Sequence, residues 1–436
     1  MIVRESGKAG TGWRWIAAAG GVTLLIVLWA LGPLSTKRAE APVCEDAIGC
    51  VVVGPEEPLR IGVLQDQSGS GGAIGIEQAR LIRMALADRG GTLLGHAVHL
   101  EEEDARCSPE GGRVAASKLA ADPRIVAVLG TTCSGSAATA IPVISQAGLS
   151  MVSGINSAYT LTGALGKRGR DWRPGYYRTR HNGAFQGEMA ARFAFHRLGI
   201  RRAATIDDGD TYTRGLAEMF RRAFRGLGGN IVLGVTMDKE DIEMAPVLSG
   251  IRESGAEFLF IPLFRPQALR LVRQAARRRD FAKIVLLGGS ALVSERFVEA
   301  IGEAGRGLYF TNVAQEENPA IDVLVERYRR RFGQVELISG FASGHDAVTL
   351  LLAGIERAAV RMPDGTVSIG RQALRDTLSG IAELPGLSGK LTCDAFGDCG
   401  VPVFTILRLD DPALGVEGLR RNEVDRFRWG KEGGDG

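Results

Sequence analysis

The stretch LGTTCSGSAAT (Leu129–Thr139) joins an apolar run to a helix-like segment through Gly, Ser, Thr and one cysteine. This composition is compatible with a phosphate-binding loop, a catalytic thiol, or a ligand pocket with a structural cysteine. A nucleophilic Cys133 needs a lowered pKa and a partner base, and no histidine lies nearby in the sequence. Ser134 and Ser136 are then either an ordinary N-cap or hydroxyls at a helix N-terminus, where free N–H groups and the helix dipole favour a carboxylate.

Two glycine-containing stretches suggest other chemistry. SGSGGAIG (Ser68–Gly75) resembles a dinucleotide-binding loop, but Ile74 stands where that motif has its last glycine, and no Walker loop occurs. GGSAL (Gly288–Leu292) is close to the G-x-S-x-G turn of hydrolases, with Ser290 as nucleophile and His345 as a later base. A leucine replaces the second glycine, and the helical pattern around His345 favours a packed histidine. A serine hydrolase is therefore the least favoured alternative, and we expect neither a cofactor nor an enzyme.

Size and charge exclude other classes of function. The 436 residues include 45% hydrophobic residues and carry a formal net charge of +3. This length suits two lobes better than one ordinary core. The mild charge implies no nucleic-acid partner, and we expect the arginine-rich stretches on solvated helix faces.

The segment Trp15–Leu34 carries no charge over about the length of a membrane-spanning helix. Basic residues precede it, which favours a cytoplasmic N-terminus and an exported body. A cleaved signal peptide is the alternative, although Pro42 follows the nearest small-x-small site. The expected regions are a cytoplasmic tail (1–14), a retained transmembrane anchor (15–34), a polar linker (35–58) and an extracytoplasmic body, periplasmic or at the cell surface.

Export makes disulfides the expected state of the six cysteines. Two pairs share one spacing, and the remaining two cysteines follow strands that we expect to be neighbours. Neither CxxC-type spacings nor nearby histidines support a zinc site, so no metal is expected. The predicted disulfides are Cys44–Cys50, Cys107–Cys133 and Cys393–Cys399.

Short apolar strands alternate with helix patterns in two consecutive blocks, which begin at Leu59–Leu64 and Ala203–Asp208. Strands separated by helices of this length form parallel sheets with crossovers. The chain is therefore predicted to be an α/β protein with two lobes that share late elements such as the strand Val401–Leu409. The first block is predicted to contain strands 59–64, 97–104 and 125–130 and helices 75–91 and 108–122.

Five segments carry a family resemblance: LRIGVLQDQSG, GGTLLGHAVHLEEEDARCSPEGG, VLGTTCSGSAATAIPVISQAGLSMVSGINSAYTLT, DDGDTYTRGLAEMF and GFASGHDAVTLLLAGIERA. In this order and spacing, from Leu59 to Leu409, they resemble type I extracytoplasmic solute-binding proteins of the leucine/isoleucine/valine-binding kind. The resemblance implies two Rossmann-like lobes joined by three crossover strands, with ligand bound in the cleft between them. The implied crossings lie near 178–182, 311–315 and 389–393, and the implied lobes are 59–180 with 315–390 and 181–314 with 391–430.

The resemblance also implies the site residues. The serine that binds ligand carboxylate falls on Ser134, the next contacts on Ile155 and Ser157, and two aromatics of the second lobe on Tyr212 and Phe264. All follow predicted strand ends, where open α/β sheets bind ligands. The full candidate set is Ser134, Ser136, Ile155, Asn156, Ser157, Tyr212, Phe264 and Ser290.

The expected function is capture of a small extracellular solute for delivery to an ABC permease. A ligand-sensing ectodomain that signals through a membrane partner is the alternative, and neighbouring permease or kinase genes would distinguish the two. Ser290 stands where amino-acid binders of the family commonly have an acid that pairs with ligand ammonium. We therefore expect an organic acid, an amide or a similar solute without an α-ammonium, unless Asp207, Asp208 or Asp210 restores the charge.

Overall fold

The computed structural model describes residues 44–314, 318–333, 335–336, 339–400 and 402–428. Residues from Cys44 onward form one compact unit. Within this described part of the chain, no helix is both long and apolar enough to cross a membrane. The predicted tail and anchor, residues 1–34, lie outside the described residues.

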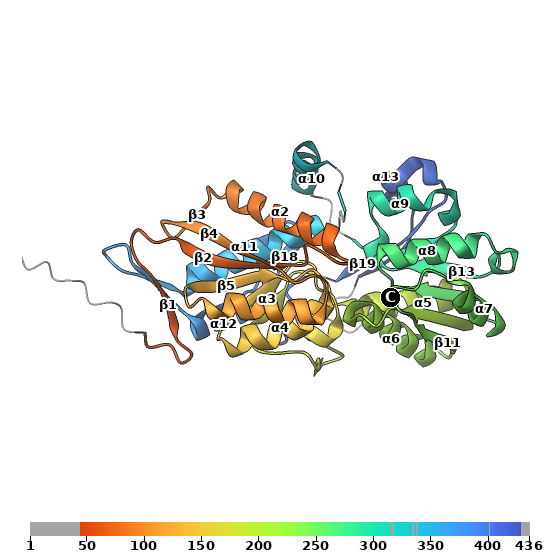
Figure 1. Cartoon of the computed structure of the whole chain (residues 1–436), viewed down its shortest axis with the longest axis horizontal. Helices are drawn as coiled ribbons and strands as arrows, with labels where there is room; N and C mark the ends of the chain where they lie inside the picture. The colour runs from red at the N-terminus through yellow and green to blue at the C-terminus, as the bar shows by residue number, and fades with distance from the viewer. Residues whose placement is uncertain (1–43, 315–317, 334, 337–338, 401, 429–436) are drawn as a thin grey trace, which may run out of the picture. The chain divides into compact units, whose positions relative to one another are not determined.

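The first lobe is built on a six-stranded sheet in the order β3-β4-β2-β5-β6-β9 (Figure 1). All neighbours pair in parallel except the short β3. Side chains alternate along a strand, so Ile61 and Val63 of β2 pack with helices α2 and α11, and Leu64 packs with α3 and α4. The elements are β2 (Leu59–Gln65), α2 (Gly72–Asp88), β3 (Thr92–Leu93), β4 (His96–Asp104), α3 (Pro109–Ala121), β5 (Ile125–Gly130), α4 (Ser134–Gln146), β6 (Met151–Ser153), β9 (Tyr176–Arg178) and α11 (Gly340–Ala358).

The second lobe is built on a seven-stranded sheet in the order β11-β10-β12-β13-β14-β19-β20. Phe258 and Phe260 of β12 pack on Phe220 of α6, with ring centroids 5.7 and 5.0 Å apart, whereas Leu259 and Ile261 face α7, α8 and α9. The last two strands run antiparallel to their neighbours. The elements are α5 (Gly183–Arg192), β10 (Arg202–Asp207), α6 (Thr211–Gly226), β11 (Asn230–Thr236), α7 (Ala245–Glu253), β12 (Phe258–Ile261), α8 (Arg265–Ala276), β13 (Val285–Gly288), α9 (Glu295–Ile301), β14 (Tyr309–Val313), β19 (Val403–Arg408), α13 (Gly415–Arg421) and β20 (Glu423–Arg428).

Three crossings join the lobes, and the third lies later than expected. The first connects β9 to α5 and the second follows β14. The third was expected near 389–393, but the hairpin β17 (Leu384–Gly386) and β18 (Gly389–Leu391) stays with the first lobe. Leu391 and Cys399 are buried in that lobe's core, and Arg178 N donates to Gly397 O at 2.9 Å. Residues 391–399 therefore belong to the first lobe, and the chain enters the second sheet only at β19.

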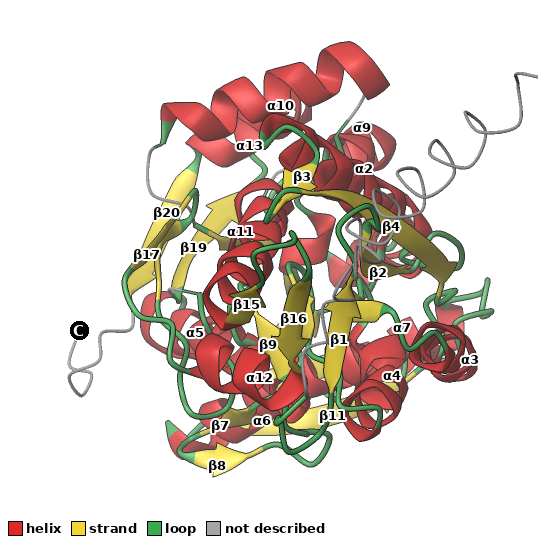
Figure 2. Ribbon diagram, turned by 90° about the vertical axis from the view of Figure 1, so that its left-hand side faces the viewer, coloured by secondary structure: helices red, strands yellow, loops and turns green. Residues whose placement is uncertain are grey.

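The predicted linker is wrong from Cys44 onward, because this segment is folded onto the first lobe. Strand β1 (Cys50–Val53) pairs with β16 (Val367–Gly370), and β16 pairs with β15 (Ala359–Arg361) (Figure 2). Two valines of β1 are 3% exposed and lie in the first lobe's core. Asp46 accepts hydrogen bonds from two backbone N–H groups at the start of α12 (Arg371–Ser379), which fixes the segment further.

One further α-helix and one small hairpin lie outside the two sheets. Helix α10 (Pro319–Phe332) buries its apolar face in a core shared with the second lobe, while its Arg327 pairs with Asp88 of α2. The hairpin of β7 (Gly163–Ala164) and β8 (Lys167–Arg168) follows β6.

All three predicted disulfides form, Cys44–Cys50, Cys107–Cys133 and Cys393–Cys399.

Candidate functional site

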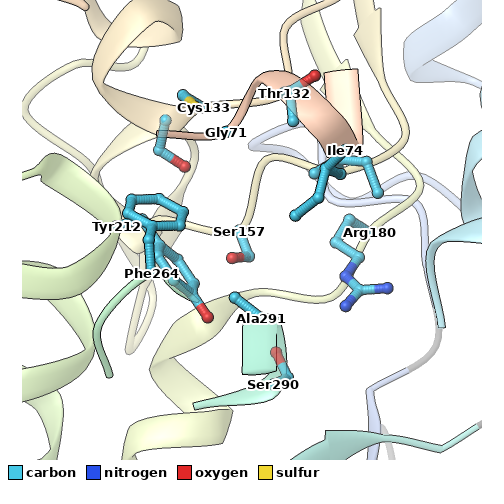
Figure 3. Close-up of a pocket in the computed structure, with 12 residues that line it drawn as sticks. Gly71, Ile74, Thr132, Cys133, Ser157, Arg180, Tyr212, Phe264, Ser290 and Ala291 are labelled. Atoms are coloured by element: carbon cyan, nitrogen blue, oxygen red, sulfur yellow. The ribbon is translucent and has the colours of Figure 1, made fainter. Parts of the chain in front are cut away.

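A pocket of about 430 Å³, counted to its open mouth, lies between loops that follow strands of both sheets (Figure 3). Of the eight predicted site residues, six line it: Ser134, Ile155, Ser157, Tyr212, Phe264 and Ser290. The other lining residues are Gly71, Ile74, Thr132, Cys133, Arg180 and Ala291.

The first lobe shapes its side of the pocket with the loop between β5 and α4. The Cys107–Cys133 disulfide ties this loop to the end of β4. The expectation that the two cysteines follow neighbouring strands is wrong, because β2 lies between β4 and β5 in the sheet. A Cβ on Gly71 would lie 2.4 Å from Cys133 Sγ, so only glycine lets the start of α2 pass the disulfide. The disulfide thus serves as part of the pocket wall, and Cys133 has no free thiol that could act as a nucleophile.

Asp66, which sequence reasoning did not single out, holds this loop from beneath. Its buried carboxylate accepts four hydrogen bonds, from the N–H groups of Cys107 (2.8 Å), Thr132 (3.0 Å) and Cys133 (2.6 Å) and from Ser136 Oγ (2.5 Å). Burial raises the pKa of Asp66 to about 6, although these bonds oppose the shift. The carboxylate therefore remains ionised at neutral pH and takes up donors of the loop before α4 together with the hydroxyl group of Ser136.

Ser136 and Asn156, the other two predicted site residues, do not line the pocket. Ser136 donates to Asp66 and is fully buried. Asn156 donates from Nδ2 to Thr132 O at 2.9 Å and accepts from Tyr176 Oη at 3.0 Å. Both side chains hold the loops that carry their neighbours.

The second lobe supplies two aromatic rings. Tyr212 lies in the first turn of α6 and Phe264 precedes α8, and their ring centroids are 5.5 Å apart at an interplanar angle of 38°. Asp210 caps α6 by accepting from Tyr212 N at 2.8 Å, and its other oxygen lies 3.7 Å from Lys239 Nζ. The Tyr212–Phe264 pair forms an apolar wall.

Three aspartates could have restored an ammonium partner, yet none of them lines the pocket. Asp207 lies 3.7 Å from Arg221 Nη1, and Asp208 accepts from Thr213 Oγ1 at 2.5 Å. Asp210 is engaged as described. None of the described lining residues is Asp, Glu or His.

Ser290 lies in a hydroxyl and amide network rather than beside a base. Its Oγ donates to Gln186 Oε1 at 3.4 Å, and Gln186 Nε2 donates to Thr311 Oγ1 at 2.6 Å. An amide oxygen does not take up the proton that a nucleophilic serine loses. His345 lies on α11 with its Nδ1 3.8 Å from Asp346, so the geometry gives no support to the hydrolase alternative.

Arg180, in the first crossing, also lines the pocket and was missed in the sequence. Its Nη1 donates to Ser339 O at 2.5 Å and its Nη2 to Ser339 Oγ at 3.1 Å. Burial lowers the pKa of Arg180 to about 10, which leaves the guanidinium charged at neutral pH. No acidic side chain among the described residues forms an ion pair with it.

In the described part of the chain, no group of three or more His, Cys, Asp or Glu side chains is arranged to hold a metal ion.

Comparisons with known proteins agree with one another. Residues 58–400 match the family model described as periplasmic binding protein. The chain is 25% identical over 356 residues to Leu/Ile/Val-binding protein homolog 3 of Brucella melitensis, covering 81% of this chain and 92% of that protein. It is 22% identical over 397 residues to the leucine-, isoleucine-, valine-, threonine- and alanine-binding protein of Pseudomonas aeruginosa, covering 90% of this chain and 97% of that protein.

Solved structures share the fold. A leucine-binding protein from Thermotoga maritima superposes with a TM-score of 0.69 at 25% identity, covering 81% of this chain and 96% of that chain. An ABC transporter solute-binding protein from R. palustris in complex with benzoate has a TM-score of 0.68 at 19% identity, covering 85% of this chain and 96% of that chain.

Proposed function

The chain belongs to the periplasmic binding protein family, in its leucine/isoleucine/valine-binding branch, and we propose that its pocket captures a small organic acid or amide for an ABC transporter. The observation that carries this proposal is the pocket itself, which both lobes line at the ends of their strands. Ligands bind at this edge of open α/β sheets, and two lobes that close on a solute bury it between preformed surfaces.

The polar lining supports a neutral or anionic ligand rather than an amino acid. Hydroxyl groups and backbone atoms line the pocket, and no described lining residue is acidic. An ammonium buried there would lose several kcal/mol of hydration without a counter-charge. The relatives' names specify amino acids, and we propose that this chain departs from them because Ser290 replaces the expected acid.

We assign the ligand contacts within this proposal. Ser134 and Ser157 offer hydroxyl groups, Ile155 offers backbone and apolar surface, and the Tyr212–Phe264 pair covers the apolar body of the ligand. Ser136 and Asn156 act as positioning residues, because their polar groups bond to Asp66 and to the pocket loops.

The setting that we propose is extracytoplasmic, with delivery to a permease in the membrane. Three disulfides suit an oxidising compartment. The uncharged segment Trp15–Leu34 supports a retained membrane anchor. Native protein should therefore stay with membranes through a carbonate wash, and recovery of a soluble form that begins near Pro42 would show a cleaved signal instead.

Titration calorimetry of the native protein tests the binding function. The panel contains 4-methylpentanoate, phenylacetate and benzoate, their primary amides, and leucine and valine. We expect micromolar or tighter binding of at least one acid or amide and weak binding of both amino acids. Micromolar binding of leucine or valine, with no response to the acids and amides, would overturn the proposed ligand class.

A further inference from the structure

We infer that Arg180 binds the carboxylate of the ligand, and that the ligand is a small monocarboxylate with an apolar body whose acid group points away from α4. This inference rests on the proposed function, since it names the ligand class and orientation for the same pocket. Neither the family resemblance nor the set of predicted site residues included Arg180.

The first step is the unmatched charge of Arg180. The side chain is 4% exposed, and its two hydrogen bonds go to the neutral Ser339. A guanidinium has five N–H donors, so three have no acceptor among the described residues. A buried cation without a counter-charge is costly, and a carboxylate fits the fork of N–H groups in a bidentate way.

The nearby Arg178 is a buried arginine whose charge and N–H groups are matched by protein groups. Arg178, two residues earlier and also buried, donates from Nε to Asp398 Oδ1 at 2.5 Å. Its Nη1 donates to Ala158 O at 2.8 Å and its Nη2 to Thr162 Oγ1 at 2.6 Å. Arg178 is thus matched by protein groups and does not line the pocket, whereas Arg180 lines the pocket and has no acid of its own.

The second step is that the opposite end of the pocket already holds negative charge. The Asp66 carboxylate lies beneath the start of α4, where it accepts from two N–H groups of the preceding loop and from the hydroxyl group of Ser136 in the first turn. Asp210, from the second lobe, lies against the first turn of α4, since a Cβ on Gly135 would be 2.6 Å from Asp210 Oδ2. Lys239 Nζ, 3.7 Å from Asp210 Oδ2, offsets the charge of Asp210, whereas no ion pair is formed by Asp66 among the described residues. A ligand carboxylate at this helix end would therefore face the charge of Asp66, and the charges favour its placement at Arg180.

The third step concerns the body of the ligand. In the close-up, the Tyr212–Phe264 pair and Arg180 lie on opposite sides of the pocket, with Ser157 between them (Figure 3). Ile74 adds apolar surface above. One cation and one apolar wall suit a ligand with one acid group, because a second carboxylate would have no matching cation in the lining.

The test compares each acid with its own amide in variants of Arg180. Calorimetry is run on native protein, Arg180→Met and Arg180→Lys with 4-methylpentanoate, phenylacetate, benzoate and their primary amides. Loss of one partner of a buried charge pair lowers affinity by about 100-fold. We therefore expect Arg180→Met to bind about 100-fold more weakly the acid that binds native protein tightest. We expect Arg180→Lys to recover part of this loss. The affinity ratio of acid to amide should fall to about one in Arg180→Met, a change that general destabilisation does not produce.

Arg375→Met is the matched control. Arg375 is also buried, and its Nη2 donates to the backbone oxygens of Ser145 and Leu149, but it does not line the pocket. This variant should lose thermal stability and keep the native acid-to-amide ratio. An unchanged ratio in a folded Arg180→Met variant, or amides that bind native protein as tightly as acids, would overturn the role of Arg180 while leaving solute binding intact. No response of native protein to any acid, amide or amino acid would instead contradict the proposed function, and this inference with it.

Discussion

At the α4 end of the pocket, Asp66 and Asp210 place two carboxylates beside a helix N-terminus, whereas at the first crossing Arg180 presents a cation without an acidic partner among the described residues. A helix N-terminus attracts anions, yet here the protein supplies those anions itself. The short connection between β9 and α5 carries Arg180, the charged group that is still unmatched. The charge available to a ligand is therefore the charge that remains after the protein's own groups have paired.

The α4 end of the pocket is also the end that is held by more contacts within the protein. Four donors converge on Asp66, and the Cys107–Cys133 disulfide fixes the same loop. The Arg180 end rests on two bonds to Ser339. We therefore expect changes at the α4 end to act mainly on stability, and changes at the Arg180 end to act mainly on ligand choice.

The largest expected effect is that of Asp66→Asn. An asparagine places an NH2 group against buried donors, and leaving two of them unsatisfied costs roughly 2 to 4 kcal/mol of unfolding free energy. Denaturant unfolding at pH 7.5 measures this loss. Asp104→Asn is the control, because Asp104 also accepts bonds at a strand end, from Gln67 N and Arg106 N, but is partly exposed, so water replaces them. Equal losses of unfolding free energy in both variants would contradict a special contribution of Asp66 to stability.

The next largest effect is expected on ligand affinity when a negative charge is added at Ser290. Ser290→Asp supplies the ammonium partner that the pocket lacks, so leucine affinity should rise and acid affinity should fall, each by about tenfold. Ser290→Ala removes the hydroxyl group without adding charge and should change acid affinity by no more than about threefold. Leucine titrations that are identical for Ser290→Asp and native protein would mean that Ser290 lies outside the ligand's reach.

A smaller effect is expected from removal of a negative charge at the α4 end. Asparagine caps helices as well as aspartate does, so Asp210→Asn keeps α6 intact while it weakens the field against an anion. We expect acid affinity to rise by about two- to threefold. Asp238→Asn, on an exposed turn of the same lobe, should have no effect. A tenfold loss of acid binding in Asp210→Asn would indicate that Asp210 contacts the ligand directly.

The smallest expected effect is that of pH on acid binding. Arg180, with a pKa lowered only to about 10, stays charged below pH 9. Burial and the nearby Arg180 lower the pKa of His181 to about 3, so this neighbour stays neutral. Carboxylic acids are ionised above about pH 5, and Asp66, with a pKa of about 6, is ionised above about pH 7, so the affinity should be flat from pH 7 to 9. A change in acid affinity between pH 7 and 9 in calorimetric titrations would contradict a permanently charged arginine as the partner of the anion.

The alternation of strands and helices is predicted well, because apolar residues recur with a period of about two in strands and about 3.6 in helices. Strand–helix alternation sets parallel sheets, and two equal cysteine spacings leave one remaining pair, as the disulfides confirm. Strand β1 is missed because four residues within a polar segment carry little periodic signal. The late third crossing is missed because residues up to Cys399 are held by contacts with Arg178 that are distant in sequence.

The site shows a similar limit. Placing residues after strand ends brings six of the eight candidates to one pocket, but it cannot tell which hydroxyl group is already engaged. Ser134 and Ser136 look alike in the sequence, and only the fold gives Ser136 to Asp66. Arg178 and Arg180 likewise share one short segment, and only the position of Asp398 separates the paired arginine from the unpaired one.

The most direct measurement is a crystal structure of the native protein with the acid from the panel that binds tightest. We expect the ligand in this pocket, with its carboxylate oxygens about 2.7 to 2.9 Å from the nitrogens of Arg180 and its apolar body against Tyr212 and Phe264. A carboxylate bound instead to the N–H groups at the start of α4, beside Ser134, would contradict this expectation.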